Sequence, residues 1–116
     1  MDNKTALGKL TVRQLRARRR RLARQLADPE STLRGTLVSQ TRRCGKPGCR
    51  CAHGELHGPY VYLSVGRATG RARLLYVPAA LAEAVRRRVE LTEATEAALA
   101  EISAINLELL SRRELE

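Results

Sequence analysis

The amino-acid sequence predicts an α+β protein with an N-terminal basic helix, a small three-stranded antiparallel sheet stabilised by zinc, and a long, coiled-coil-like C-terminal helix. Arginine recurs at helical spacing over residues 11–27, three strand-like runs lie within 34–78, and 79–113 contain neither glycine nor proline. All three cysteines and both histidines fall within residues 44–57. A chain of 116 residues has room for one modest core, and such a core benefits from a bound metal.

Residues 1–10 are expected to form a flexible tail ahead of the basic helix. The segment Thr-Val-Arg-Gln over 11–14 has the spacing of a capping box, which places the start of a helix at Thr11. Pro29 ends that helix, which should therefore run to about Ala27. Its narrow apolar stripe consists of Val12, Leu15, Leu22 and Leu26.

Seven arginines cover the remainder of this helix, and the helix has no acidic residue with which they could pair. They are Arg13, Arg16, Arg18, Arg19, Arg20, Arg21 and Arg24. Such a surface is either solvated and balanced by acids elsewhere, or it binds a polyanion. We favour a polyanion because neighbouring like charges repel one another.

The net charge of +10 is unevenly distributed: +8 over residues 1–27, +5 over 28–78 and −3 over 79–116. This asymmetry predicts a nucleic acid as the partner. We favour DNA over RNA, although Tyr60 and Tyr62 leave RNA open as the alternative, because readers of single-stranded RNA stack bases on aromatic residues. A membrane partner is not expected, because the sequence has no long apolar segment and no signal peptide. The odd number of cysteines fits a reducing compartment, so we expect the protein in the cytoplasm.

Three strands are expected, over residues 35–43, 60–66 and 71–77. If residues 67–70 form the loop between the last two strands, Tyr62 pairs with Leu75 and Ser64 with Arg73. One face of the sheet is then continuously apolar. The other face carries Tyr60, Tyr62, Ser64, Arg71 and Arg73, with Leu75 as its apolar exception. Such a basic face is either an ordinary solvent-exposed surface or one that lies against a nucleic-acid groove.

One long helix is expected over residues 79–113, and it would be about 50 Å long at 1.5 Å per residue. A coiled-coil spacing runs through Leu99, Ile102, Asn106 and Leu109. The sheet is too small to cover such a helix, so its spare apolar face meets either helix 11–27 or a second copy of the chain. We favour a homodimer, because a single polar Asn106 in an apolar seam is a device that fixes register in dimers.

The cysteine cluster predicts a zinc site rather than three free thiols. Zinc binds four thiolate or imidazole ligands tetrahedrally, and the sequence supplies Cys44, Cys49 and Cys51 close together. His57 is the preferred fourth ligand because a longer segment lets the chain fold back to the metal, and His53 is the alternative. Basic neighbours would help to keep the thiols deprotonated.

These basic neighbours are also candidate nucleic-acid contacts. Around the cluster and on the sheet they are Arg42, Arg43, Lys46, Arg50, Arg67, Arg71 and Arg73. Glu55 is the only acidic residue between Ser31 and Ala82, so no pair of carboxylates lies near the cluster to support catalysis. We therefore do not expect an enzyme.

Residues 44–51 (C-G-K-P-G-C-R-C) and 57–60 (H-G-P-Y) resemble a family of small uncharacterised prokaryotic proteins with the pattern C-G-K-P-x-C-x-C, a short spacer and H-G-P-Y. The similarity covers roughly residues 34–110 and leaves the arginine-rich helix outside. The resemblance implies that His57, rather than His53, belongs with the cysteines. It implies no activity, although proteins of this kind often accompany mobile elements.

The sequence therefore predicts a zinc-stabilised DNA-binding protein, linked to a mobile element, that contacts phosphates through helix 11–27 and a basic sheet face. The zinc-binding β domain would cover residues 34–78, and the helix over 79–113 would form the dimer. The alternative is an adaptor whose long helix docks a larger DNA-processing enzyme, such as a recombinase.

Overall fold

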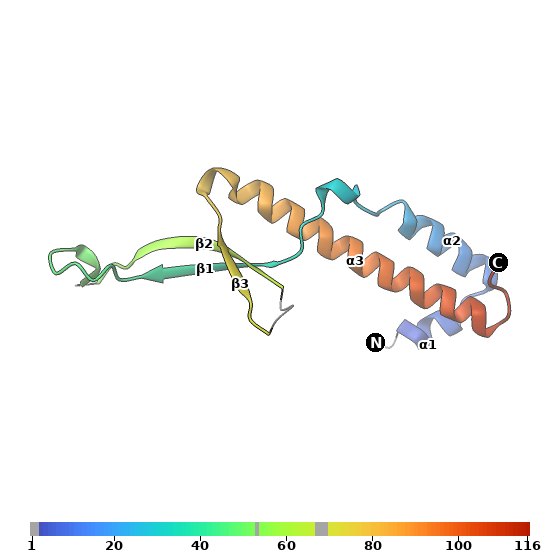
Figure 1. Ribbon diagram of the computed structural model, residues 1–116. Coiled ribbons are helices and arrows are strands. Elements are labelled where there is room, and N and C mark those ends of the chain that lie inside the picture. Colours follow the sequence, from blue (N-terminus) through green and yellow to red (C-terminus); the bar gives the residue numbers. More distant parts are fainter. Residues whose placement is uncertain (1–2, 53, 67–69) are drawn as a thin grey trace. The chain divides into compact units, whose positions relative to one another are not determined.

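The computed structural model describes residues 3–52, 54–66 and 70–116 and confirms the α+β fold class (Figure 1). Its helices and strands are, in order, α1 (Asn3–Gly8), α2 (Val12–Ala23), β1 (Thr36–Arg42), β2 (His57–Val65), β3 (Arg73–Tyr76) and α3 (Ala82–Ser111). Three short 3₁₀ helices lie at Pro29–Ser31, Arg50–Ala52 and Ala79–Leu81. The chain divides into two compact units. We call Met1–Thr32 with Leu91–Glu116 the helical unit, and Leu33–Glu90 the sheet unit.

The predicted capping box begins α2. The Thr11 hydroxyl accepts a hydrogen bond from the Gln14 N–H at 3.1 Å, and the Thr11 N–H donates to Gln14 Oε1 at 2.9 Å. The helix ends at Ala23, four residues earlier than expected. Beyond it, the Ala27 N–H donates to Thr95 Oγ1 of α3 at 2.9 Å. A tertiary hydrogen bond thus takes the place of the expected last helical turn.

The prediction of a flexible tail over residues 1–10 is wrong from Asn3 onward, because Asn3–Gly8 forms α1. The reason is burial: Leu7 is only 2% exposed and packs in one cluster with Leu15, Ile105 and Leu109. This cluster is the core of the helical unit. It joins α2 to the C-terminal part of α3, which is the pairing within the chain that the sequence left open.

Arg112 connects the end of α3 to the end of α1. Its guanidinium donates to the backbone carbonyls of Leu7, Gly8 and Leu10 at 3.2, 3.2 and 2.6 Å. These are carbonyls at and just beyond the helix C-terminus, which lack partners within the helix. A cation is favourable there because the C-terminus is the negative end of the helix dipole.

The predicted strands are present, and the sheet order is β1-β2-β3 with antiparallel neighbours. The predicted register between β2 and β3 is wrong by one residue: Tyr62 pairs with Tyr76 and not with Leu75, and Val65 pairs with Arg73. A shift of one residue exchanges the two faces of a strand. Arg73 therefore lies on the Val65 side of the sheet, away from the tyrosines.

Burial of Val77 explains this register. The Val77 N–H donates to the Val61 carbonyl at 2.8 Å, and the Val77 side chain packs against Leu63 and Val89 in the core of the sheet unit. The register predicted from the sequence instead placed Tyr76 on the buried side. Because Val77 is the buried residue, its neighbour Tyr76 projects to the outer face.

The expected long helix is confirmed as α3, with 30 residues. It ends although the sequence offers no glycine there: Arg113 adopts a left-handed φ of 59°, and the Glu114 N–H donates to the Leu109 carbonyl at 2.8 Å. With the bond from the Arg113 N–H to the Leu110 carbonyl at 2.9 Å, this is a Schellman motif.

Candidate metal centre and its basic surroundings

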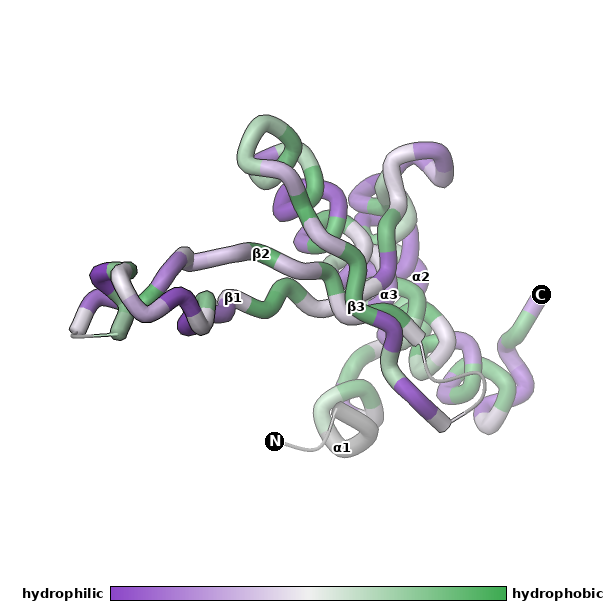
Figure 2. The backbone as a smooth tube through the Cα atoms, turned by 60° about the vertical axis from the view of Figure 1, so that its left-hand side comes forward, coloured by the Kyte–Doolittle hydropathy of each residue, from purple (hydrophilic) through white to green (hydrophobic). Residues whose placement is uncertain are grey.

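The cysteine cluster lies in the loop that joins β1 to β2 (Figure 1). Since β3 pairs only with Tyr62–Val65, the hairpin has two strands where it approaches this loop. Figure 2 shows its colouring change from hydrophobic beside β3 to mainly hydrophilic toward the loop. Among the described residues from Ser39 to Tyr60, only Cys51 is buried, with 1% exposure. Apolar packing therefore contributes little to holding this end of the hairpin together.

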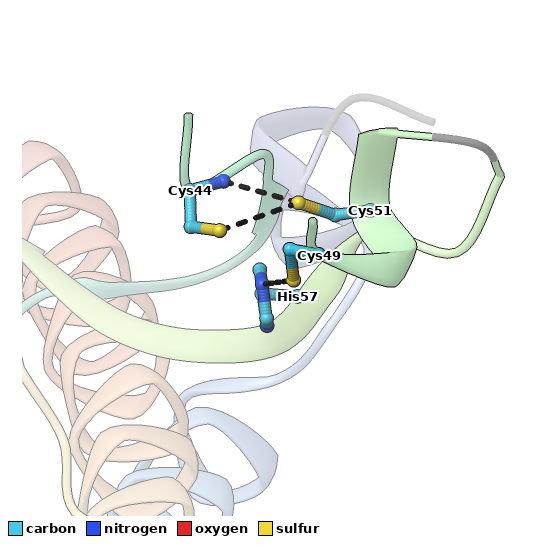
Figure 3. A group of neighbouring side chains, drawn as sticks. All are labelled: Cys44, Cys49, Cys51 and His57. Carbon is cyan, nitrogen blue, oxygen red and sulfur yellow. Dashed lines mark hydrogen bonds between the residues drawn. The ribbon is translucent and has the colours of Figure 1, made fainter. Parts of the chain in front are cut away.

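The structure brings together the four predicted ligands, Cys44, Cys49, Cys51 and His57 (Figure 3). Their sulfur and nitrogen ligand atoms all lie within 4.8 Å of one another. The sulfurs of Cys44 and Cys51 are 3.5 Å apart, and Cys49 Sγ is 3.0 Å from His57 Nε2. For comparison, zinc–sulfur bonds of about 2.3 Å imply sulfur–sulfur distances of about 3.8 Å in a tetrahedron. The four side chains are therefore close enough to bind one metal ion.

The backbone supports a thiolate at this site. The Cys44 N–H donates to Cys51 Sγ at 3.3 Å, and this bond is the main reason that the pKa of the Cys51 thiol is lowered. At Cys44, the Lys46 N–H lowers the pKa of the thiol, but hydrogen bonds with Cys51 and Cys49 and burial outweigh it and raise the pKa. Cys51 is thus the better thiolate of these two, and a cation would relieve the repulsion that ionising further thiols creates.

Two glycines shape the loop. Gly45, directly after the first ligand, has a φ of 79°, which non-glycine residues rarely adopt. Gly58, directly after His57, has a φ of 111°, and a Cβ there would lie 2.9 Å from the Gln40 carbonyl oxygen. Gly58 thus lets β2 pass close to β1 at the irregularity in their pairing. The H-G-P-Y segment positions the histidine as well as supplying it.

Exposed cations lie in and beside the loop over residues 43–56, which carries the cysteine cluster and which we call the metal loop. They are Arg42, Arg43, Lys46 and Arg50. Within the described part of the chain, none of the four forms an ion pair. The Arg42 guanidinium carbon lies 4.6 Å from the ring centre of Tyr60, and both residues line a shallow hollow beside Cys44 and His57. The basic surface and the metal site are therefore adjacent.

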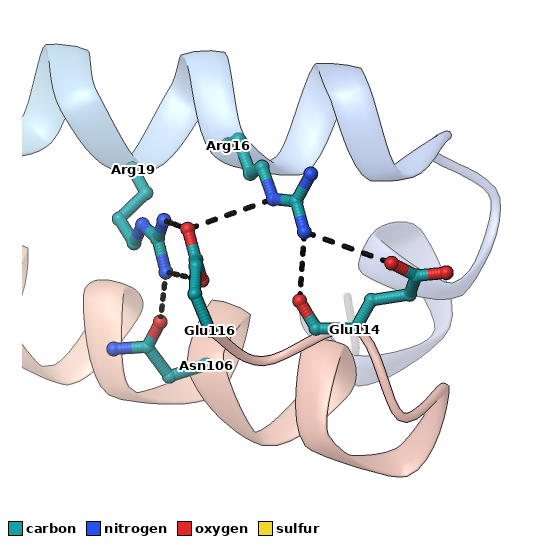
Figure 4. Close-up of polar contacts among 5 residues, drawn as sticks. All are labelled: Arg16, Arg19, Asn106, Glu114 and Glu116. Carbon is teal, nitrogen blue, oxygen red and sulfur yellow. Dashed lines mark hydrogen bonds and ion pairs between the residues drawn. The ribbon is translucent and has the colours of Figure 1, made fainter.

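The arginines of α2 are only partly available. Arg19 pairs with Glu116 at 2.5 Å and donates a hydrogen bond to Asn106 at 2.7 Å (Figure 4). Arg16 pairs with Glu114 and Glu116 at 3.6 Å each. The hydrogen bond from Arg19 is the main reason that the pKa of Glu116 falls to about 2. Acids that follow α3 in the sequence thus neutralise arginines of α2.

Arg18 forms a further ion pair, with Glu101 of α3. Three arginines of α2 and its C-cap residue Arg24 have no ion pair with any described residue and are exposed. The three within α2 are Arg13, Arg20 and Arg21. The alternative interpretation of this helix, in which acids elsewhere balance its charge, therefore holds for Arg16, Arg18 and Arg19, whose acidic partners lie far away in the sequence.

The remaining predicted contacts on the sheet have different outcomes. Arg71 is exposed and precedes β3, so it is not part of the sheet. Arg73 lies on the face opposite the tyrosines. The prediction that both arginines share a face with the tyrosines is therefore wrong. Arg67, the loop over 67–69 and the alternative ligand His53 lie outside the described residues.

Most of the net charge belongs to the sheet unit. The helical unit contains eleven Lys or Arg and nine Asp or Glu, giving +2. The sheet unit contains eleven Lys or Arg and only three Asp or Glu, giving +8. The excess of positive charge that an anionic partner would meet is therefore greater in the sheet unit than in the helical unit.

Fold and site together define a class: small α+β proteins with a Cys₃His cluster, able to hold a metal ion, in the loop between two antiparallel strands. Residues 12–87 match the model of one family, described as Domain of unknown function (DUF6788), and the chain belongs to this family. The match begins within α2, so the arginine-rich helix is part of the shared region, contrary to the extent of about 34–110 inferred from the motif. No curated protein and no solved structure matches the chain.

In the described part of the chain, no helix is both long and apolar enough to cross a membrane.

We predict that His57→Ala impairs metal binding while His53→Ala does not. Removing a ligand should cost more than the 10–100-fold in affinity typical of losing a residue that merely supports one. Titration with Co²⁺, whose visible absorption reports tetrahedral thiolate coordination, measures stoichiometry and affinity together. We expect one Co²⁺ per chain in the wild type and in His53→Ala. Loss of binding in His53→Ala, with retention in His57→Ala, would identify the other histidine as the ligand.

Proposed function

We propose that the protein is a zinc-stabilised DNA-binding protein. Three thiolates and one imidazole are a ligand set that suits tetrahedral zinc. Cys44, Cys49, Cys51 and His57 would fill all four positions and leave none for a reacting water, so the metal's role would be structural rather than catalytic. Thiolate ligands need reducing conditions, which is why we place the protein in the cytoplasm.

The observation that carries DNA binding is the +8 charge of the sheet unit, with exposed and unpaired cations beside the metal site. Arg43, Lys46 and Arg50 all lie in the loop that the metal ligands would hold in one conformation. A fixed set of cations loses less conformational entropy on meeting phosphates than the same residues in a mobile segment. Zinc would therefore support binding indirectly, by holding these cations in place.

The exposed arginines of α2 form a second candidate surface, on the helical unit. Arg13, Arg20 and Arg24 lie along one line of the helix, and a shallow hollow forms around Ala17 between the first two. Arginine donates several hydrogen bonds in a fixed plane and suits phosphate well. These residues would add phosphate contacts that do not depend on base sequence.

We predict that Arg43→Ala, Lys46→Ala and Arg50→Ala together weaken binding to duplex DNA by at least tenfold and reduce its salt dependence. Each phosphate that the protein no longer neutralises should lower the slope of log affinity against log salt by roughly 0.9. Fluorescence anisotropy with a labelled duplex, between 50 and 200 mM NaCl, measures both quantities.

The matched control removes three cations that already have acidic partners: Arg16→Ala, Arg18→Ala and Arg86→Ala. Circular dichroism checks that both triple variants remain folded. An equal reduction of affinity in the two variants would show that only net charge matters. Binding that is indifferent to salt, or that is absent with both duplex and single-stranded DNA, would contradict DNA binding altogether.

We also propose that α3 forms a homodimer, although not through the predicted seam as a whole. Leu109 of that seam is buried in the core of the helical unit, and Asn106 accepts a hydrogen bond from Arg19. On the C-terminal part of α3, Leu99, Leu107 and Leu110 are 50%, 64% and 57% exposed and, at spacings of eight and three, lie on one side of the helix. Light scattering should give twice the mass of one chain, and serine at all three positions should yield a folded monomer. A wild-type monomer would contradict the dimer and favour the adaptor alternative, in which the same leucines bind a larger DNA-processing protein.

A further inference from the structure

All the aromatic residues of the chain lie on one face of the sheet. The chain contains three tyrosines and no phenylalanine or tryptophan. Tyr62 pairs directly with Tyr76, and their ring centres are 5.8 Å apart in an edge-to-face arrangement. Tyr60 lies two residues from Tyr62 on the same strand, so it points to the same side. We call this the tyrosine face.

The tyrosine face has no role in the hydrophobic core. The core of the sheet unit lies on the opposite side, where Leu63 and Val77 pack against Val89 of α3. No tyrosine belongs to either hydrophobic cluster, and Tyr76 is 57% exposed, with Leu74 beside it on the same face at 49%. Exposed aromatic rings are common at binding surfaces, because they offer a rigid area at little conformational cost.

Cations continue the tyrosine face at its metal end. The Arg42 guanidinium stacks on Tyr60 at 4.6 Å, and Arg43, Lys46 and Arg50 follow in the loop. Aromatic rings next to a group of cations match a polynucleotide, which offers bases for stacking and phosphates for ion pairs along one strand. The complementary charge argues against a neutral protein partner for the exposed Leu74 and Tyr76.

The aromatic rings also favour a single-stranded ligand over a duplex. In a duplex the faces of the bases are covered by their neighbours in the stack, so a tyrosine ring meets only backbone and groove edges. In a single strand the base faces are free, and stacking on aromatic side chains supplies a large share of the affinity.

We propose that the tyrosine face binds single-stranded DNA, with unpaired bases stacked on Tyr60, Tyr62 and Tyr76 and the adjacent phosphates held by the cations of the metal loop. This inference rests on the proposed DNA-binding function and deepens it, because it names the form of DNA that the sheet unit recognises.

Intrinsic fluorescence provides a direct test, since every emitting tyrosine lies on this face and the chain has no tryptophan. Titration with dT₁₂ should quench tyrosine emission, after correction with N-acetyltyrosinamide for absorption by the DNA. A 12-base-pair duplex should quench it much less at equal occupancy, as measured by anisotropy of labelled DNA. An RNA strand of the same length (U₁₂) forms a third arm.

Variants separate stacking from charge. Tyr76→Leu keeps the apolar volume but removes the ring, and should weaken dT₁₂ binding by roughly fivefold or more. Tyr76→Phe keeps the ring, and should change the affinity less than twofold. Neither variant should alter duplex binding by more than about twofold.

The outcomes distinguish the two proposals. Salt-dependent duplex binding without tyrosine quenching, and with Tyr76→Leu equal to wild type on dT₁₂, overturns the stacking surface but leaves the DNA-binding function standing. If the protein binds none of the three nucleic acids, both the stacking surface and the DNA-binding function are overturned. Stronger quenching and binding by U₁₂ than by dT₁₂ overturns DNA as the strand that is bound.

Discussion

The β1–β2 hairpin extends beyond the part of the sheet that β3 completes, and the residues described there form no hydrophobic core of their own. An isolated two-stranded hairpin is marginally stable in water. Cys44 and His57 lie at the two strand ends, and Cys49 and Cys51 lie in the loop between them, so one metal ion would join all parts of this segment. Structural zinc stabilises small folds by about 10–16 kcal/mol, which is ample for a hairpin of this length. The same metal–ligand bonds would also fix the positions of the exposed cations in the loop.

Charge pairing distinguishes the two units. In the helical unit, carboxylates of α3 and of the residues that follow it neutralise three arginines of α2, and this pairing supports the contact between the helices. In the sheet unit, the cations around the metal loop have no such partners among the described residues. Arginine content alone would have selected α2 as the main binding surface. Once the ion pairs are taken into account, the sheet unit is the better candidate for the main binding surface. The outer face of its sheet also carries all three tyrosines.

Features set by local sequence could be predicted well. The capping box at Thr11, the continuous helix of α3 and the convergence of Cys44, Cys49, Cys51 and His57 each follow from residue types at short spacing. Features set by tertiary contacts could not. The β2–β3 register depended on whether Val77 or Tyr76 would be buried against α3, and both choices gave one largely apolar face. The ion pairs of Arg16 and Arg19 join residues about a hundred positions apart, and α1 exists because Leu7 is buried beneath α3.

The claim that a metal ion holds the end of the hairpin in one conformation is tested most directly by hydrogen exchange with and without a zinc chelator. Removal of the metal should speed exchange in peptides that cover residues 40–60, because the strand pairing there would lose its main support. Exchange in α2 and in the C-terminal part of α3 should stay unchanged, since the core around Leu15, Ile105 and Leu109 does not involve the metal loop. Equal protection of residues 40–60 before and after chelation, in protein shown to have contained zinc, would contradict the claim.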